Sequence, residues 1–268
     1  MRGPRTLVWR GVYELLGARV REPAWAFMNY GYADPEGGDA PAPGHDLPLD
    51  PADEPDRSCI RLYAATVAGV DLTGADVLEV GSGRGGGASY LSRYAGPRST
   101  TGLDFSAAAV SLARQHRRGP GLRFVRGDAL AMPFADASFD AVVNVESSHC
   151  YPSVPTFLTE VHRVLRPGGH LLLADLRDAD DVPTLHAQLA GSGLRVEETG
   201  DITAHVVAAL HRDNARKMRL IQAWIPRPVH RVFRVFAGIE GTRNQLGLAR
   251  GDLRYVRVRA VKPQVNAS

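Results

Sequence analysis

A short apolar strand that runs into a glycine-rich turn constrains this chain more than any other feature. Residues 77–87 read VLEVGSGRGGG, and a helix-compatible segment follows at 88–94. Glycine has no Cβ, so a turn of this composition lets the backbone pass close to a bound cofactor. Gly81, Gly83 and Gly86 also satisfy the dinucleotide pattern G-x-G-x-x-G, which by itself is a weak signal. The turn predicts a nucleotide-type cofactor and leaves its identity open.

Strands and helices alternate downstream of residue 75. Near-continuous apolar runs at 77–80, 141–143 and 171–173 are typical of strands that are buried on both faces of a sheet. Alternation of such strands with helices indicates an α/β fold with a doubly wound, mostly parallel seven-stranded sheet of the Rossmann-like kind. We expect strands at 77–80, 99–103, 122–126, 139–145, 170–175, 194–198 and 255–261, and helices at 57–70, 88–94, 106–117, 154–165 and 183–190.

Four segments are expected along the chain. They are an N-terminal helical cap and mobile loop over 1–56, a cofactor-binding core over 57–200, a helical lid insertion over 201–250, and the last core strand with a tail over 251–268.

Within the first segment, helical apolar spacing predicts one or two helices over 6–32. Residues 34–56 are rich in Pro, Gly, Asp and Ala and are expected to be irregular. The insertion is expected to break at Pro226 and Pro228 and to act as a lid over the cofactor domain.

Charge is distributed unevenly. The whole chain has a net charge of +3, whereas residues 201–268 hold thirteen Lys/Arg against four Asp/Glu, a local +9. This basic quarter fits a solvated arginine-rich face, or attraction to nucleic acid, anionic lipid or an acidic substrate. Because no RNA-binding module accompanies it, we expect no nucleic-acid partner.

Two further absences bound the class of protein. No run of about 18 apolar residues exists, so an integral membrane segment is not expected. Two cysteines, Cys59 and Cys150, make no disulfide framework, and a cytoplasmic location is the simplest expectation. A homo-oligomer remains compatible with the sequence.

Acidic residues follow the expected strands at the positions where open α/β sheets bind their ligands. Asp104 lies 23 positions after Gly81, the spacing expected for a carboxylate that accepts both ribose hydroxyls. Its alternative role is a helix N-cap. Asp128 follows the third strand, and Glu146 and His149 follow the fourth.

The ordered set of motifs resembles the class I S-adenosylmethionine-dependent methyltransferases. The motifs are VLEVGSGRGGG over 77–87, GLDF over 102–105, GDALAMPF over 127–134, SFD over 138–140 and EVHRVLRPGG over 160–169. NAD-binding folds lack the signatures at 127–129 and 165–169. The resemblance therefore implies S-adenosylmethionine as the cofactor and S-adenosylhomocysteine as its product.

The resemblance implies a role for each matching position. The glycines line the methionine moiety, Glu79 fixes the turn, Asp104 holds the ribose, Phe105 packs on adenine, and Asp128 bonds the adenine amino group. Phe105 alternatively packs in the core, and Glu79 alternatively caps backbone amides. The expected cofactor-binding residues are Glu79, Gly81, Ser82, Gly83, Asp104, Phe105, Asp128, Ala129, Glu146 and Tyr30.

Methylation of an alcohol needs a general base, because an alcohol does not ionise readily. The segment ESSHCYP over 146–152 resembles the equivalent loop of bacterial sugar O-methyltransferases. In those enzymes a histidine at this position pairs with an aspartate at the end of the next strand. The resemblance implies His149 as base and Asp175 as its supporting carboxylate. The alternatives are a loop histidine that binds backbone or cofactor, and an aspartate that only ends a strand.

Aromatic and histidine side chains outside the core are further candidates. Trp25, Tyr30 and Tyr32 are expected to cover the cofactor or stack on an acceptor, with an aromatic mini-core for the N-terminal helix as the alternative. Candidates to enter the pocket are His205, His211 and Trp224, and for the two histidines a helix surface is the alternative.

The segments 27–32 and 146–151 together resemble the phthiotriol dimycocerosate and glycopeptidolipid O-methyltransferases of actinobacteria. We therefore predict O-methylation of a sugar or aliphatic hydroxyl on a bacterial secondary metabolite or glycolipid. The acceptor is a small molecule. The alternatives are C- or N-methylation of a natural product and a non-methylating cyclase of the same fold. No metal is expected, because the acidic loop around 175–181 lacks His/Cys ligand spacing.

Overall fold

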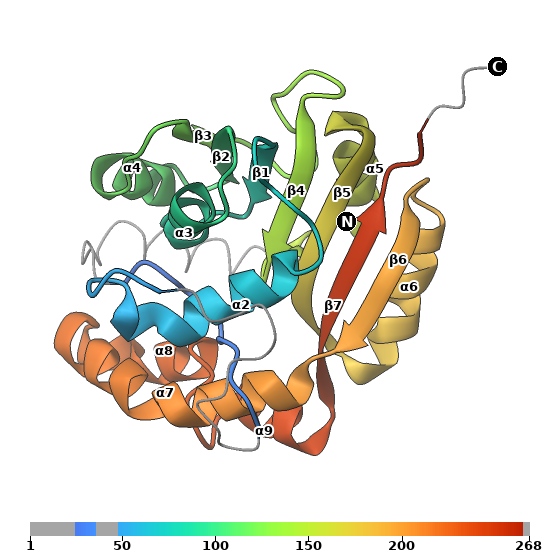
Figure 1. The fold of residues 1–268 in the computed structure, drawn as a ribbon. Coiled ribbons are helices and arrows are strands. Elements are labelled where there is room, and N and C mark those ends of the chain that lie inside the picture. The colour runs from blue at the N-terminus through green and yellow to red at the C-terminus, as the bar shows by residue number, and fades with distance from the viewer. Residues whose placement is uncertain (1–24, 36–47, 265–268) are drawn as a thin grey trace.

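The structure is a computed structural model, and it describes residues 25–35 and 48–264 of the 268-residue chain. A seven-stranded sheet with the order β3-β2-β1-β4-β5-β7-β6 forms its centre (Figure 1). All neighbours pair in parallel except β7, which runs antiparallel to both β5 and β6. The predicted mostly parallel, doubly wound sheet is confirmed. The strands are β1 Asp76–Val80, β2 Ser99–Asp104, β3 Leu122–Arg126, β4 Phe139–Val145, β5 Leu165–Asp178, β6 Arg195–Asp201 and β7 Leu253–Val261.

Helices cover both faces of the sheet (Figure 1). Successive side chains of a strand point to opposite faces, so Leu172 packs with α2 and α3 while Leu171 and Leu173 pack with α5 and α6. This arrangement explains why the strands read as unbroken apolar runs. The α-helices are α2 Arg57–Val67, α3 Gly86–Tyr94, α4 Ala107–His116, α5 Val154–Val164, α6 Val182–Ala190, α7 Thr203–Trp224, α8 His230–Phe236 and α9 Arg243–Arg250, and short 3₁₀ turns are η1 Glu54–Asp56, η2 Ser148–Cys150, η3 Ala179–Asp181 and η4 Arg227–Val229.

Helix starts follow local side-chain chemistry. The Ser106 hydroxyl accepts a bond from the Ala109 amide at the start of α4, and Ser153 caps α5 through the Thr156 amide. Such caps satisfy amides that the first helical turn leaves without a partner. Helix α4 begins shortly after the carboxyl end of β2, and α5 begins after the loop that follows β4. The two caps therefore help to fix the loops at the carboxyl ends of these strands.

Helices α7, α8 and α9 lie between β6 and β7 in sequence, and they gather beyond the end of the sheet where β6 stops and β7 begins (Figure 1). Asp178 at the carboxyl end of β5 pairs with Leu253 at the start of β7, so this is also the carboxyl end of the parallel strands. None of the described helices is long and apolar enough to cross a membrane.

Two expectations differ from the structure. The strand expected at 170–175 spans Leu165–Asp178, because β7 pairs with it from His170 to Asp178 and β4 pairs with Leu165. The Pro-Gly-Gly run at 167–169 lies inside that strand.

Helix was expected over 6–32, but the described part, 25–32, is not helical. Its backbone bonds instead to two helices: the Tyr32 amide donates to the Ser58 carbonyl, and the following Ala33 amide donates to the His205 carbonyl. Tertiary contacts thus override the local apolar spacing. Residues 6–24 lie outside the described residues.

Candidate active site

The glycine-rich turn leaves β1 and passes between the ends of β2 and β4. The amides of Gly81 and Ser82 both donate to the Leu103 carbonyl, at 2.8 and 3.0 Å. Gly81 has a φ of 78°, and a Cβ placed on it would lie 2.3 Å from Ser147 Oγ. Only glycine fits this close approach without strain. The turn is therefore in direct contact with the loop that follows β4.

Glu79 is buried in β1 directly before this turn. The Tyr63 hydroxyl donates to Glu79 Oε1 at 2.5 Å. Burial raises the pKa of Glu79 to about 8, although the Tyr63 bond and the Ala88 amide favour the ionised form. Glu79 Oε2 and Ser82 Oγ are buried and have no hydrogen-bond partner among the described residues. These two atoms are available to a ligand at the turn.

Asp104 connects the end of β2 to the glycine turn. Its Oδ2 accepts the Gly83 amide at 2.8 Å, and its Oδ1 accepts the Ser106 amide at 2.9 Å. Ser106 is the N-cap of α4, so the alternative role of Asp104 as that cap is wrong. Phe105 is 42% exposed and does not pack in the core. An exposed aromatic ring therefore stands beside a fixed carboxylate.

The loop after β3 lies next to this carboxylate. The Gly127 amide donates to the Asp104 carbonyl at 3.0 Å, and Asp128 Oδ1 accepts the Leu130 amide at 2.9 Å. Ala129 is partly buried against the core. Asp104 and Asp128 thus come from neighbouring strand ends.

These features fit S-adenosylmethionine. The ligand offers a ribose diol, an aromatic base and a methionine end with both donors and acceptors. Around the turn, the described residues present the carboxylate of Asp104 and the exposed ring of Phe105. They also present the two buried oxygens, Glu79 Oε2 and Ser82 Oγ, that have no hydrogen-bond partner among the described residues. Among the described residues, no cluster of three or more His, Cys, Asp or Glu side chains is placed to hold a metal ion.

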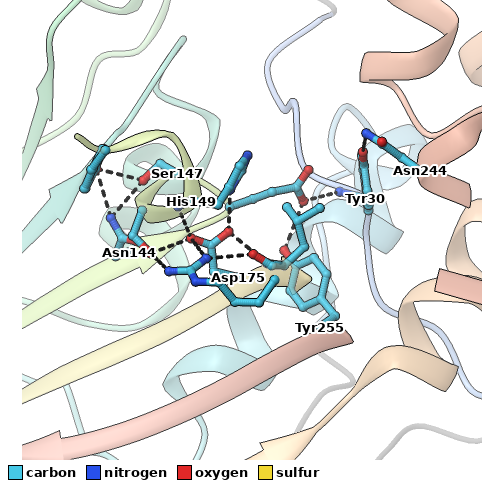
Figure 2. Close-up of polar contacts among 12 residues, drawn as sticks. Tyr30, Asn144, Ser147, His149, Asp175, Asn244 and Tyr255 are labelled. Carbon is cyan, nitrogen blue, oxygen red and sulfur yellow. Dashed lines mark hydrogen bonds and ion pairs between the residues drawn. The ribbon is translucent and has the colours of Figure 1, made fainter. Parts of the chain in front are cut away.

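His149 and Asp175 face each other at the ends of β4 and β5 (Figure 2). His149 Nδ1 lies 2.7 Å from Asp175 Oδ1, and the His149 amide donates to Asp175 Oδ2 at 2.9 Å. Asp175 is fully buried, whereas the His149 side chain is 31% exposed. The imidazole is thus oriented through Nδ1 from the interior, and Nε2 lies on the opposite side of the ring.

Two residues that sequence reasoning missed complete this pair. Ser148 Oγ donates to Asp175 Oδ2 at 2.5 Å, and Arg177 Nη1 lies 3.0 Å from the same oxygen. Arg177 Nη2 also donates to Ser148 Oγ at 2.6 Å. Arg177 follows Asp175 by two residues, so the strand period of two gave a signal for it.

Charge coupling sets the protonation of the pair. Burial alone would raise the pKa of Asp175, but His149 and Arg177 hold it well below its usual range. Burial alone would lower the pKa of His149, but the charge of Asp175, the neighbouring Cys150 and the hydrogen bonds raise it well above its usual value. The coupling between the two groups therefore favours the form in which His149 is an imidazolium and Asp175 a carboxylate.

A second polar group holds the loop after β4 against the glycine turn (Figure 2). Asn144 Nδ2 lies 2.8 Å from Ser147 Oγ, 3.1 Å from the Tyr151 hydroxyl and 2.9 Å from the Val80 carbonyl. No sequence pattern indicates this group, because its members are an asparagine in β4 and ordinary serine and tyrosine residues of the following loop. Its effect is to fix the backbone on which His149 stands.

Glu146 connects this loop to distant parts of the chain. It has a φ of 51°, and its Oε2 accepts the Tyr30 amide at 2.8 Å and the Tyr255 hydroxyl at 3.0 Å. Asn244 in α9 donates to the Tyr30 hydroxyl at 2.8 Å. Burial raises the pKa of Glu146 to about 7. The contact of Glu146 and Tyr30 with cofactor stays a prediction. The structure shows in addition that Glu146 holds the segment 25–35 in place through the Tyr30 amide.

The other candidates lie away from the pair. His205 stacks on Tyr32 with ring centroids 4.4 Å apart, which leaves it a contact of the 25–35 segment. His211 is on the exposed surface of α7, as its alternative held, and Trp224 at the end of the same helix is also exposed.

Removal of the Phe105 ring is expected to weaken cofactor binding without unfolding the protein. Phe105→Ala removes an exposed ring, so the free energy of unfolding should change by less than about 0.5 kcal/mol. Loss of stacking should raise the Kd for S-adenosylmethionine by about 2- to 13-fold. Calorimetric titration measures the Kd, and Val196→Ala, another exposed apolar side chain, is the control. An unchanged Kd would contradict a role of Phe105 in cofactor binding.

The sheet order, the glycine turn and the carboxylates after β2 and β3 define a nucleotide-cofactor domain of the methyltransferase kind. The family model described as "Methyltransferase domain" matches residues 78–173. The chain belongs to the class I S-adenosylmethionine-dependent methyltransferases, and it is an enzyme that uses S-adenosylmethionine.

Curated relatives cover most of the chain. The phthiotriol/phenolphthiotriol dimycocerosates methyltransferase of Mycobacterium tuberculosis is 42% identical over 248 residues, which is 92% of this chain and 89% of the relative. The fatty-acid O-methyltransferase of Mycolicibacterium smegmatis is 43% identical over 202 residues, which is 75% of this chain and 71% of the relative.

Solved structures agree on the fold. The cyclase SpnF superposes with a TM-score of 0.70 at 20% identity and covers 95% of each chain. The geranyl diphosphate C-methyltransferase of Streptomyces coelicolor A3(2) superposes with a TM-score of 0.62 at 16% identity, covering 93% of this chain and 98% of that one. At these identities the likeness concerns the fold alone.

Proposed function

We propose that the enzyme transfers a methyl group to a hydroxyl oxygen of a lipid-like bacterial metabolite, an aliphatic alcohol or a sugar hydroxyl, with His149 as general base. The observation that carries this proposal is the 2.7 Å bond between His149 Nδ1 and Asp175 Oδ1 at the carboxyl ends of β4 and β5. Two relatives support a lipid-like acceptor, because they are named for phthiotriol dimycocerosates and for fatty acids.

In this proposal the chain binds, orients and removes a proton. Bound S-adenosylmethionine supplies the electrophilic methyl group. Asp104, Phe105 and Asp128 would hold its nucleoside, and the glycine turn would line its methionine end. Nε2 of His149 takes the hydroxyl proton as the oxygen attacks, and the buried carboxylate of Asp175 stabilises the imidazolium that results. Arg177 and Ser148 keep that carboxylate ionised and fixed.

The proposed base predicts a particular pH dependence. Only neutral His149 accepts a proton, and its pKa is raised well above 6.5. The value of kcat/KM should therefore rise with pH and inflect above 6.5. In Asp175→Asn the raising charge is gone, so the inflection should move to lower pH while the plateau rate falls. A profile that is flat from pH 6 to 9 in the wild type would contradict the role of His149.

Methylation of a fatty-acid carboxylate is the second candidate, and the 43% identity with the fatty-acid O-methyltransferase favours it. A carboxylate is already ionised at neutral pH and needs no base. The two candidates therefore differ in how much they depend on His149.

An acceptor panel tests the proposed function. The purified enzyme is incubated with S-adenosylmethionine and, in turn, a long-chain secondary alcohol, an alkyl glycoside and a fatty acid, and release of S-adenosylhomocysteine is measured. Release with the alcohol or the glycoside is the expected result. Turnover of the fatty acid alone would overturn the proposal in favour of the second candidate.

A further inference from the structure

The end of α7 and the start of α8 form a sharp corner on the surface. Helix α7 ends at Trp224, the turn η4 follows, and α8 begins at His230. Pro226 and Pro228 lie in the turn, which explains why the helix breaks there. We call residues 219–234 the α7–α8 corner.

Apolar side chains project from this corner into solvent. Trp224 is 50% exposed and Val232 is 40% exposed. The other large hydrophobic side chains of the described residues with comparable exposure are Phe105, at the cofactor site, and Val196, on the edge strand β6. Large aromatic and apolar groups at the surface are characteristic of interaction sites when they are grouped. In the α7–α8 corner two of them lie eight residues apart in sequence, Trp224 at the end of α7 and Val232 in α8.

The charge around these side chains has a single sign. Residues 214–239 hold six Lys/Arg and no Asp or Glu. Of the six, four are exposed and form no ion pair with any described residue. These four are Arg219, Arg227, Arg231 and Arg234.

Several arginines elsewhere in the basic C-terminal quarter are paired. Arg216 pairs with Asp213 and Asp56, and Arg257 and Arg259 both pair with Glu198. The exposed arginines of this quarter that form no ion pair with a described residue are the four of the α7–α8 corner and, outside it, Arg212, Arg243 and Arg250. The corner therefore holds four of these uncompensated charges within sixteen residues, on the same segment as Trp224 and Val232.

A small apolar core holds the corner in place. Ile221, Ile225 and Phe233 are buried together with Ala237 and Ile239, and Trp25 packs edge-on against Phe233 at 6.0 Å. His230 Nε2 lies 2.7 Å from the Ile225 carbonyl. These buried contacts hold the corner in a conformation that leaves Trp224 and Val232 exposed, so docking requires no rearrangement of the corner.

We propose that the α7–α8 corner docks the enzyme on an anionic lipid surface. Trp224 and Val232 enter the headgroup region, where amphipathic aromatic rings are favoured. The four arginines bind lipid phosphates, for which the guanidinium fork is well suited. An acidic protein surface matches the charge equally well, but the prolines, valine and tryptophan between the arginines favour a partner with an apolar interior.

The α7–α8 corner belongs to the helices at the end of the sheet where the candidate active site lies. Helices α7, α8 and α9 lie beyond the carboxyl end of the parallel strands, the end that carries His149 and Asp175 (Figure 1). Docking by this corner would hold that end of the enzyme at the source of a lipid acceptor. In this respect the inference rests on the proposed function, but its test does not depend on turnover.

Vesicle sedimentation tests the docking. The full chain is mixed with vesicles of phosphatidylcholine alone or of phosphatidylcholine with phosphatidylglycerol. Each arginine near an anionic surface contributes about five-fold in partitioning, so Arg227→Glu with Arg231→Glu should weaken binding by more than about 25-fold at low salt. Trp224→Ser with Val232→Ser should also weaken binding, and that loss should persist at high salt because it is not electrostatic.

Matched controls change the same residue types elsewhere. Val196→Ser removes an exposed apolar side chain, and Arg118→Glu with Arg195→Glu reverses two exposed arginines. Both controls should bind vesicles like the wild type. Methylation of a short, water-soluble alcohol should be unchanged in the corner variants, which separates loss of docking from failure of the proposed function.

Three outcomes would overturn the proposal. The first is wild-type protein that stays in the supernatant with anionic vesicles, and the second is an equal loss of binding in the corner and control variants. Alternatively, light scattering could show a dimer that the Trp224→Ser, Val232→Ser variant abolishes, which would assign the corner to a second copy of this chain. Sedimentation with anionic vesicles that depends on the corner and not on the controls is the result that supports the proposal.

Discussion

Replacing His149 by alanine is expected to lower kcat for an alcohol acceptor by about 10²- to 10⁴-fold, the usual contribution of a general base. The fold should survive, because Asp175 keeps Arg177, the Ser148 hydroxyl and the Leu176 amide as partners. The Kd for S-adenosylmethionine should stay unchanged, since the residues proposed to hold the nucleoside, Asp104, Phe105 and Asp128, follow β2 and β3, whereas His149 follows β4. Steady-state kinetics and calorimetric titration on the same preparation measure both quantities.

The control for this change is His211→Ala. His211 is exposed on α7 and lies outside the pair, so its removal should leave kcat within about two-fold. Near-full kcat in His149→Ala, with cofactor affinity intact, would mean that the acceptor ionises without a base. Loss of cofactor affinity in the same variant would assign His149 to cofactor binding instead.

Replacing Asp104 by alanine is expected to have the largest effect on cofactor affinity. A hydrogen bond to a charged group contributes about 1.5–3 kcal/mol, so the Kd for S-adenosylmethionine should rise by roughly 10- to 150-fold. The change also removes the acceptor for the Gly83 and Ser106 amides, which hold the glycine turn against β2. Both effects are expected to raise the Kd for S-adenosylmethionine.

Asp104→Asn separates these two contributions. It keeps an oxygen for one backbone amide but loses the charge and one acceptor, so its Kd should fall between those of the wild type and the alanine variant. Asp71→Ala, an exposed aspartate that accepts the Thr73 amide, is the control and should not change the Kd. An unchanged Kd in Asp104→Ala would contradict the placement of the ribose.

The sheet and the nucleotide side of the site could be predicted because their signals are local. Strands buried on both faces read as apolar runs, and 77–80, 99–103 and 139–145 coincide with β1, β2 and β4 to within one residue. Asp104 and Phe105 follow a strand directly, so their place at its carboxyl end needed no knowledge of distant contacts. The structure then added that Ser106 takes the capping role at α4.

The remainder of the site depends on residues that are far apart in sequence. Glu146 meets Tyr30 at a separation of 116 residues and Tyr255 at 109. No periodicity connects such positions. For the same reason the helix predicted over 6–32 is wrong for its described part, 25–32, where the Tyr32 amide bonds to α2, and the next amide, of Ala33, bonds to α7. The length of β5 likewise depends on β7, which follows β5 in sequence only after β6 and four α-helices.

The central claim is methyl transfer to a hydroxyl oxygen with proton removal by His149. Its most direct test is ¹³C NMR of the product formed from S-adenosylmethionine labelled in the methyl group, with a long-chain secondary alcohol as acceptor and with wild-type enzyme and His149→Ala side by side. The account predicts a labelled methyl ether from the wild type and very little from the variant. A label bonded to carbon or nitrogen, or equal ether formation by both enzymes, would contradict it.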